Sequence, residues 1–481
     1  METGTAWPKL IQGGMGVGVS NWRLARAVST RGHLGLVSGV AIDIVLVRRL
    51  QDGDPGGHMR DALLRFPLPA MAEEAVEKYF IEGGRSEGQP YRHLPAYSHA
   101  SPPGRYDLSV LGAFAEITLA RQGHNNAVGL NLLTKMQIPT IACLYGAMLA
   151  GVDYVVMGAG IPREIPGILD ALSEGRSASL RLDVTGLTPG DPAVNIHFDP
   201  ARYGTDMRVN RPAFLPIVSS HTLATVMSRK ASGSIQGLVV EGPNAGGHNA
   251  PPRGTPTYDA LGQPLYGERD VPDLAAIQAL GLPFWLAGGM TSPGRVADAL
   301  KTGAAGVQVG TLFAFCRESG VDPGLREQVI QMALRKEATV FTDPRASSTG
   351  YPFKVVPVAG TISEDEVYVN RPRICDLGYL REAYRTDSGS LGYRCASEPV
   401  ENYLRKGGRL EDTVGRKCLC NGLTATIGLG QLQAGGGTEP PIVTSGDDLQ
   451  TIRALLGEDG EGYGADEVID YLLPAHSAAH V

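Results

Sequence analysis

Short runs rich in valine, isoleucine and leucine alternate with helical stretches along most of this chain, and that alternation constrains the fold most. Eight runs have the composition of strands: residues 9–12, 34–37, 126–130, 152–157, 214–218, 235–240, 283–286 and 306–309. Strands separated by helices pair in parallel, and eight of them close into a barrel. The sequence therefore predicts an α/β fold, a TIM (β/α)8 barrel.

Two regions depart from the alternation. An inserted region at about 41–123 contains Gly- and Pro-rich loops and helical stretches, and we expect it to cap the barrel mouth. After residue 320 the strand–helix periodicity stops. The predicted organisation is a barrel over residues 1–320, a substrate-capping extension with cysteines over 321–430, and a linker with C-terminal helices over 431–481. In residues 179–198, two strand-like runs flank a turn that contains Pro and Gly, and this pattern predicts an extra hairpin.

Charge and hydropathy exclude several classes of partner. The formal net charge is −7 over 481 residues, and no block of lysine and arginine offsets it, which argues against nucleic acid. Residues 1–8 do not resemble a signal peptide, so we expect a cytoplasmic protein. The apolar stretch 138–160 contains Pro139 and Asp153, and it predicts a buried helix followed by a core strand. No membrane partner is expected.

Two glycine turns follow the last two predicted strands. Gly288 and Gly289 precede a helix with Ser292 at the N-cap and Pro293 at its first position, and the final strand, which contains Gln308, ends in Gly310 and Thr311. Free N–H groups at such a helix start bind anions, and the loops after strands 7 and 8 form the common phosphate site of barrels. For either turn alone, an anion site and a simple tight turn between strand and helix explain the glycines equally well. Together they predict a phosphate-bearing ligand.

A glycine-rich turn that ends in His248 follows the sixth strand. Imidazole titrates near neutrality, and glycines let a flat ligand approach the backbone, so His248 is a candidate for proton transfer beside a cofactor. A loop histidine bonded to the backbone is the alternative. Asn131 follows the third strand and is either a mouth residue or a turn cap. Glu241 ends the sixth strand and either contacts the ligand or has a structural role.

Four motifs in chain order carry a family resemblance: QGGMG at 12–16, AGGH at 245–248, AGGM at 287–290 and GVQVGT at 306–311. They resemble the nitronate monooxygenase (2-nitropropane dioxygenase-like) family, to which the FMN-dependent enoyl-acyl-carrier-protein reductases are related. The resemblance implies FMN and matches His248 to the family's catalytic histidine. The implied cofactor residues are Gly14, Met15, Asn131, Glu241, Gly246, Gly247, Gly288, Gly289, Gln308, Gly310 and Thr311.

Four of the six cysteines lie in the C-terminal extension: Cys375, Cys395, Cys418 and Cys420. Disulfides are rare in the cytosol, so ligation of a metal or an iron–sulfur cluster is one interpretation. The Cys-X₂₋₄-Cys pairs typical of zinc sites are absent, and iron–sulfur spacing varies more. Some relatives, among them an acyl-carrier-protein dehydrogenase/isomerase, carry a C-terminal [4Fe–4S] cluster, and the tail resembles theirs. Four reduced, buried cysteines remain the alternative.

The expected function is that of an FMN-dependent oxidoreductase of the nitronate monooxygenase type. A histidine base removes an acidic α-C–H proton, and electrons pass to FMN and then to O₂. The alternative is a dehydrogenase/isomerase or enoyl reductase acting on an acyl or enoyl thioester of coenzyme A or acyl-carrier protein. A non-catalytic flavin-binding barrel is a third reading. The substrate is a small molecule in the first two cases, and homodimer formation is left open.

Overall fold

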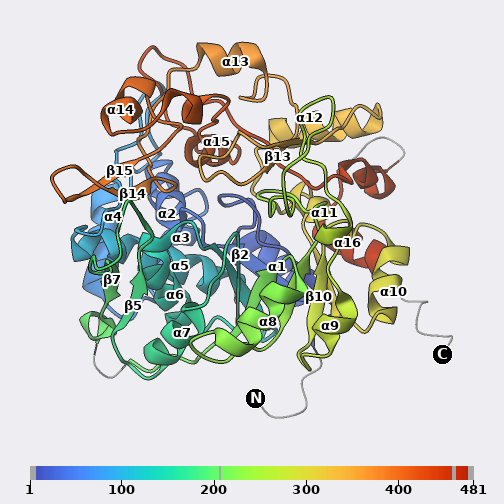
Figure 1. The fold of residues 1–481 in the computed structure, drawn as a ribbon. Helices are drawn as coiled ribbons and strands as arrows, with labels where there is room; N and C mark the ends of the chain where they lie inside the picture. Colours follow the sequence, from blue (N-terminus) through green and yellow to red (C-terminus); the bar gives the residue numbers. More distant parts are fainter. Residues whose placement is uncertain (1–6, 205–206, 458–461, 475–481) are drawn as a thin grey trace.

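The computed structural model describes residues 7–204, 207–457 and 462–474 (Figure 1). Its centre is a closed barrel of parallel strands in the order β1-β11-β10-β9-β8-β4-β3-β2. The bounds are β1 Leu10–Gln12, β2 Leu34–Ser38, β3 Val128–Leu133, β4 Tyr154–Gly158, β8 Ala213–Val218, β9 Leu238–Glu241, β10 Phe284–Ala287 and β11 Gly306–Val309. Every predicted strand is one of these, so the predicted TIM barrel is confirmed.

Helices surround the barrel, and their ends follow local sequence rules. They are α1 Trp22–Thr30, α6 Gln137–Leu149, α7 Ile165–Ser173, α8 His221–Lys230, α9 Leu274–Gln278, α10 Pro293–Lys301 and α11 Thr311–Ala314. The Asn21 side chain accepts from the N–H groups of Arg23 and Leu24 and so begins α1. Ser292 caps α10, with Pro293 at its first position, as predicted.

Residues 138–160 form most of α6 and then β4, which confirms the predicted helix and strand. Among the described residues, no helix combines the length and apolar character needed to cross a membrane.

Apolar side chains fill the inside of the barrel. Ile11, Leu36, Val156, Leu215 and Trp285 are fully buried there. The Trp285 indole donates to the Pro8 carbonyl at 2.7 Å, which satisfies its one polar group. Because the interior is packed, the barrel is not a channel, and any ligand must bind at an end.

The inserted region adds helices to the outer layer between β2 and β3. They are α2 Ile42–Gln51, α3 His58–Leu63, α4 Pro69–Tyr79 and α5 Pro103–Ala120. Helices α5 and α6 pack so closely that a Cβ at Gly146 would lie 2.1 Å from the Val110 carbonyl oxygen. Of residues 41–123, all of which the structure describes, only Ala41 lines the cavity at the barrel mouth. Most of the cover therefore comes from elsewhere.

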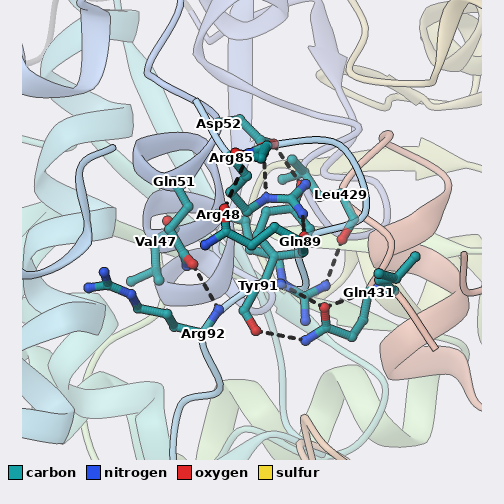
Figure 2. A network of polar contacts seen from close by, with 12 residues as sticks. Val47, Arg48, Gln51, Asp52, Arg85, Gln89, Tyr91, Arg92, Leu429 and Gln431 are labelled. Atoms are coloured by element: carbon teal, nitrogen blue, oxygen red, sulfur yellow. Dashed lines mark hydrogen bonds and ion pairs between the residues drawn. The ribbon is translucent and has the colours of Figure 1, made fainter. Parts of the chain in front are cut away.

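Polar contacts join the inserted region to the C-terminal extension (Figure 2). The Arg48 guanidinium donates to the Leu429 carbonyl at 2.6 Å. The Gln431 amide accepts from the Tyr91 backbone N–H at 2.9 Å and donates to the Tyr91 carbonyl at 3.1 Å. The insertion thus supports the extension from the side.

The C-terminal extension consists of short elements above the barrel mouth (Figure 1). They are α12 Pro323–Leu334, β12 Phe341–Asp343, β13 Phe353–Val355, α13 Asp365–Asn370, β14 Glu382–Arg385, β15 Leu391–Arg394, α14 Val400–Arg405, η3 Leu410–Thr413, α15 Leu419–Ala425, η4 Leu449–Leu455 and α16 Ala465–Leu472. Strands β12 and β13 pair antiparallel, as do β14 and β15. Strand β14 also pairs in parallel with β6 Val184–Thr185.

The predicted extra hairpin is present, because β5 Ala178–Arg181 pairs antiparallel with β7 Asn195–Phe198. Short 3-10 turns occur at η1 Pro200–Tyr203 and η2 Glu268–Asp270. Helix α16 returns to the barrel wall, where Val468 and Leu472 share one buried cluster with Leu10 and Val307. The end of the extension therefore packs on the outer side of strands β1 and β11.

Candidate active site

A cavity opens at the carboxyl ends of the barrel strands, and we call it the mouth cavity. It measures about 1650 Å³ when the open space at its entrance is included. All the residues predicted from the barrel motifs line it: Gly14, Met15, Asn131, Glu241, Gly246, Gly247, His248, Gly288, Gly289, Gln308, Gly310 and Thr311. The fold therefore brings the whole predicted set together.

Two of these glycines allow close approach of the backbone. Gly289 has φ +74°, a conformation that favours glycine. A Cβ at Gly14 would lie 2.1 Å from the Asn131 Cβ, so any larger residue would displace Asn131. The Arg295 guanidinium lies beside Gly289, with Nη1 3.0 Å from the position of a Cβ there. Sequence analysis missed Arg295, although its place in the first turn of α10 was a usable signal.

The C-terminal segment closes the cavity beside the end of the last barrel strand. The Thr311 hydroxyl accepts from the Gly446 N–H at 3.1 Å. The Thr444 hydroxyl accepts from the Gly247 N–H at 3.0 Å, and Ser445 lines the cavity between them. Sequence analysis did not predict this contact, because no local pattern marks residues 444–446 as neighbours of a barrel strand.

Two buried oxygens on the cavity wall lack a partner among the described residues. They are Oε1 of Gln308 and the hydroxyl of Ser445. A buried polar atom without a hydrogen bond costs about 1–3 kcal/mol, so such atoms call for a ligand or an ordered water. Their position beside the glycine turns indicates a polar ligand.

The extension also holds the turn that carries His248. The Asn249 N–H donates to the Pro352 carbonyl and the Lys354 N–H to the Gly247 carbonyl, both at 2.9 Å. The imidazole packs edge-on against the Phe353 ring, with centroids 4.9 Å apart. The histidine is therefore fixed from both sides, by the barrel and by β13.

His248 is held in its neutral form. Its Nε2 is hydrogen-bonded to the Ser347 hydroxyl at 2.8 Å, and Nδ1 has no partner among the described residues. Burial, and secondarily the Lys135 ammonium, lower the pKa of His248 to about 4. The imidazole is thus neutral near pH 7 and able to accept a proton. Sequence analysis missed Ser347 and Lys135.

The Glu241 carboxyl has the opposite shift. It ends β9 on the wall of the mouth cavity, and burial raises its pKa to about 8. Near pH 7 it is mostly protonated, so it can donate a hydrogen bond to a ligand.

The four cysteines of the extension line one small cavity, the thiol cavity, of about 300 Å³. Burial raises the pKa of Cys418 to about 12 and also raises those of Cys375 and Cys420, with neighbouring thiols adding to the effect. Cys420 lines the mouth cavity as well. In the part of the chain that the structure describes, no three His, Cys, Asp or Glu side chains are arranged to hold a metal ion. The thiols converge, and the cluster stays a prediction.

Comparison with known proteins gives sequence matches to one family. The nitronate monooxygenase family model matches residues 181–361. A nitronate monooxygenase from Paraburkholderia phytofirmans is 30% identical over 204 residues, which cover 42% of this chain and 52% of that protein. A probable nitronate monooxygenase from Bacillus subtilis is 33% identical over 115 residues, 23% of this chain and 30% of that protein. The match thus spans about half of the first relative and less of the second.

Two solved structures are similar over most of their length at low identity. FabK from Thermotoga maritima has a TM-score of 0.47 and 16% identity, with 97% of this chain and 92% of that chain covered. A nitroalkane oxidase from Streptomyces ansochromogenes has a TM-score of 0.46 and 13% identity, with 97% and 94% covered. Residues 181–361 are thus similar in sequence to the nitronate monooxygenase family.

Proposed function

We propose that the chain is an FMN-dependent oxidoreductase of the nitronate monooxygenase type. The observation that supports this most is that a neutral histidine and two phosphate-type glycine turns line one cavity. His248 would remove the acidified proton from the carbon beside a nitro group, and FMN held in the same cavity would supply the electron acceptor, with dioxygen as the final oxidant.

The residues at the phosphate end of the mouth cavity fit FMN. The N–H groups around Gly288, Gly289 and Gly310 provide donors, and the unpartnered Ser445 hydroxyl provides another. Arg295 lies beside Gly289 and supplies a positive charge. These groups would hold the phosphate.

Other residues that line the mouth cavity fit the flavin ring. Asn131 packs directly against the Gly14 backbone, and both residues line the cavity. Gln308 has a free amide oxygen, and protonated Glu241 supplies a donor for a carbonyl or hydroxyl of the cofactor. Bound there, FMN supplies the two-electron acceptor that side chains lack. The chain's own part is to bind the substrate, orient it and take its proton.

A second candidate substrate is an acyl or enoyl thioester. Apolar side chains of the extension, including Leu380, Leu419 and Leu423, line the mouth cavity. Such a wall suits a hydrocarbon chain better than a small nitroalkane, because it offers apolar area to bury. The carrier is then coenzyme A or an acyl-carrier protein.

The six free cysteines agree with a reducing, cytoplasmic environment.

Nitroethane and its nitronate separate the role of His248 from cofactor binding. Nitroethane must lose a C–H proton before oxidation, whereas ethylnitronate has already lost it. After reconstitution with FMN, we expect nitroethane to bleach the flavin absorbance anaerobically in the wild type. His248→Ala should slow this by about 10²-fold or more and should still oxidise ethylnitronate. His197→Ala, at an exposed position of strand β7, is the matched control.

Three results would count against the proposal. A protein that never binds FMN overturns it entirely. If acyl or enoyl thioesters bleach the flavin and neither nitroethane nor ethylnitronate does, the substrate is a thioester and not a nitro compound. A His248→Ala variant as fast as wild type on nitroethane removes the histidine from the mechanism.

For the thiol cavity we propose a [4Fe–4S] cluster, with zinc as the weaker alternative. Support comes from four thiols gathered at one cavity from separate segments of the extension. Protein purified anaerobically should contain iron and sulfide and absorb broadly in the visible. Cys420→Ser should lose both, while Cys143→Ala, which alters a core thiol of α6, should keep them. Zinc in metal analysis, or metal-free protein with four titratable thiols, would refute the cluster.

A further inference from the structure

A second cavity adjoins the mouth cavity, and we call it the polar cavity. It measures about 940 Å³ including its opening, and its lining includes Thr134, Lys135, Thr349 and Arg381. Tyr379 and Leu380 line both cavities, so the two share a wall. The proposed oxidation leaves this second, more hydrophilic space without a role.

Two hydroxyl groups, in hydrogen-bond contact with each other, connect His248 to the polar cavity. His248 Nε2 lies 2.8 Å from the Ser347 hydroxyl, and the Ser347 hydroxyl lies 2.8 Å from that of Thr349. Ser347 is 0% exposed and lines neither cavity, whereas Thr349 lines the polar cavity. This hydroxyl row, formed by Ser347 and Thr349, therefore begins at the His248 imidazole and ends at the polar cavity.

The partners of each oxygen restrict how its hydrogens can point. The Ser347 hydroxyl also accepts from the Thr349 N–H at 3.2 Å. If it accepts from His248 Nε2–H too, its own proton must point to Thr349. Within the described residues, the only other contact of the Thr349 hydroxyl is the Tyr351 N–H at 3.5 Å. Its proton is then free to point into the polar cavity.

We propose that Ser347 and Thr349 act as positioning residues that hold His248 in the Nε2–H tautomer and pass its surplus proton to the polar cavity. This inference rests on the proposed function, because it needs His248 as the base. The Ser347 bond leaves the Nδ1 lone pair free for the substrate. A base enclosed by cofactor and substrate needs a separate exit for its proton, and the hydroxyl row provides one.

The proton balance is simple. The substrate C–H proton binds to Nδ1 and its electron pair stays on the substrate. The Nε2 proton moves to Ser347, the Ser347 proton moves to Thr349, and the Thr349 proton moves to water in the polar cavity. One proton enters and one leaves, so His248 is neutral again. Reorientation of the two hydroxyls restores the starting tautomer.

The charges around His248 favour this direction. Lys135 lines the polar cavity and lies over the Tyr351 ring at 4.6 Å, and in the described part of the chain no carboxylate pairs with it. Its ammonium disfavours an imidazolium at His248. The polar cavity is also lined by the charged residues Asp183, Arg381 and Glu382. Glu241 lies on the mouth-cavity wall, and Arg416 donates to the Ser347 carbonyl. The Arg416 contact fixes the backbone of the loop and does not involve the hydroxyl row.

The tautomer can be measured without cofactor or substrate. In protein labelled with ¹⁵N-histidine, the His248 ring signals are assigned by their loss in His248→Gln. We expect Nε2–H as the main form in the wild-type protein near pH 7, and a mixture or the Nδ1–H form in Ser347→Ala. An Nδ1–H wild-type ring, or one unchanged by Ser347→Ala, would overturn the positioning role.

The relay is tested by a matched pair at one position. Thr349→Val removes the hydroxyl with little change of shape, and Thr349→Ser keeps it. With nitroethane, we expect Thr349→Val to lower the rate of anaerobic flavin bleaching by about 10-fold with KM unchanged, and Thr349→Ser to restore it. Both variants should oxidise ethylnitronate at the wild-type rate, because it carries no proton to remove.

Failure of the relay is distinguishable from failure of the proposed function. If Thr349→Val equals wild type on nitroethane while His248→Ala does not, the relay is wrong and the base stands. If Thr349→Val loses nitroethane and ethylnitronate activity equally, the defect lies in folding or cofactor binding, and the relay is also refuted. If the wild-type protein ignores both substrates, the function fails, and the tautomer still decides the role of Ser347.

Discussion

The Gly446 N–H donates to the Thr311 hydroxyl at 3.1 Å, and this bond ties the C-terminal segment to the end of the last barrel strand. A Cβ at Gly446 would lie 2.7 Å from that hydroxyl oxygen and 2.8 Å from the Asn244 carbonyl oxygen. The backbone of the extension can come this close only because the position is glycine. The proposed phosphate site is therefore shared between the barrel and a segment far from it in sequence.

The first prediction concerns this contact. Gly446→Ala should push the segment away from Thr311 and weaken FMN binding by about 10-fold, equivalent to ~1.4 kcal/mol. Quenching of flavin fluorescence during titration of the apoprotein measures the dissociation constant. Gly437→Ala is the control, because a Cβ there would meet nothing within 4 Å. Equal affinity in both variants would contradict a role for the extension in cofactor binding.

The second prediction concerns packing beneath the proposed ring site. In Gly14→Ala the new methyl group would lie 2.1 Å from the Asn131 Cβ, so strand β3 or the first turn must shift. We expect the free energy of unfolding of the apoprotein to fall by about 1–3 kcal/mol, measured by urea denaturation. Gly267→Ala adds a methyl group in open space and should have little effect. If Gly14→Ala is as stable as this control, the close approach is not a constraint.

The third prediction concerns pH and Lys135. The base works only when neutral, so the rate with nitroethane should fall on acidification through the His248 pKa of about 4. Lys135→Met removes a charge that lowers this pKa, so the acid limb of the kcat/KM profile should move to higher pH. Lys301→Met, at an exposed ion pair on α10, should leave the limb in place. If the acid limb of the kcat/KM profile has the same pH midpoint in Lys135→Met as in the wild type, the Lys135 ammonium does not act on His248.

The fourth prediction concerns Glu241 and stability. Burial raises its pKa to about 8, whereas an exposed glutamate titrates near about 4.3. Between these pH values the folded state keeps a proton that the unfolded chain has lost, so the free energy of unfolding falls as pH rises. Glu241→Gln cannot lose a proton. Urea unfolding of the apoprotein at about pH 5, 7 and 9 should therefore show a smaller fall for the variant. Parallel curves would mean that Glu241 is ionised in the folded protein.

The barrel could be predicted because the apolar residues within each strand are enough to indicate that the strand is buried. Strand β4, for example, follows a helix and carries a run of apolar residues, and that pattern needs no knowledge of its neighbours. The same holds for the cap at Ser292 and for the hairpin of β5 and β7, which depend on nearby residues. The division of the chain at residues 320 and 430 stays a prediction, although α16 packs against the barrel wall.

The candidate site divides in the same way. His248 and the glycine turns are visible in sequence, because conformation and chemistry coincide in short motifs. Ser347 and Ser445 are ordinary serines in ordinary loops, and nothing local distinguishes them from exposed ones. The expected cap shows a similar limit, because the composition of residues 41–123 predicts loops and helices but not where on the barrel they pack.

The sequence by itself determined the barrel, the order of its strands and the motifs at their carboxyl ends, because period, capping and glycine conformation act over a few residues. Only the tertiary structure decided that the extension closes the mouth cavity, that Ser347 contacts His248 and that four distant thiols line one cavity. Those contacts join segments separated by tens to hundreds of residues. Their formation depends on how the whole chain packs, which local sequence patterns do not encode.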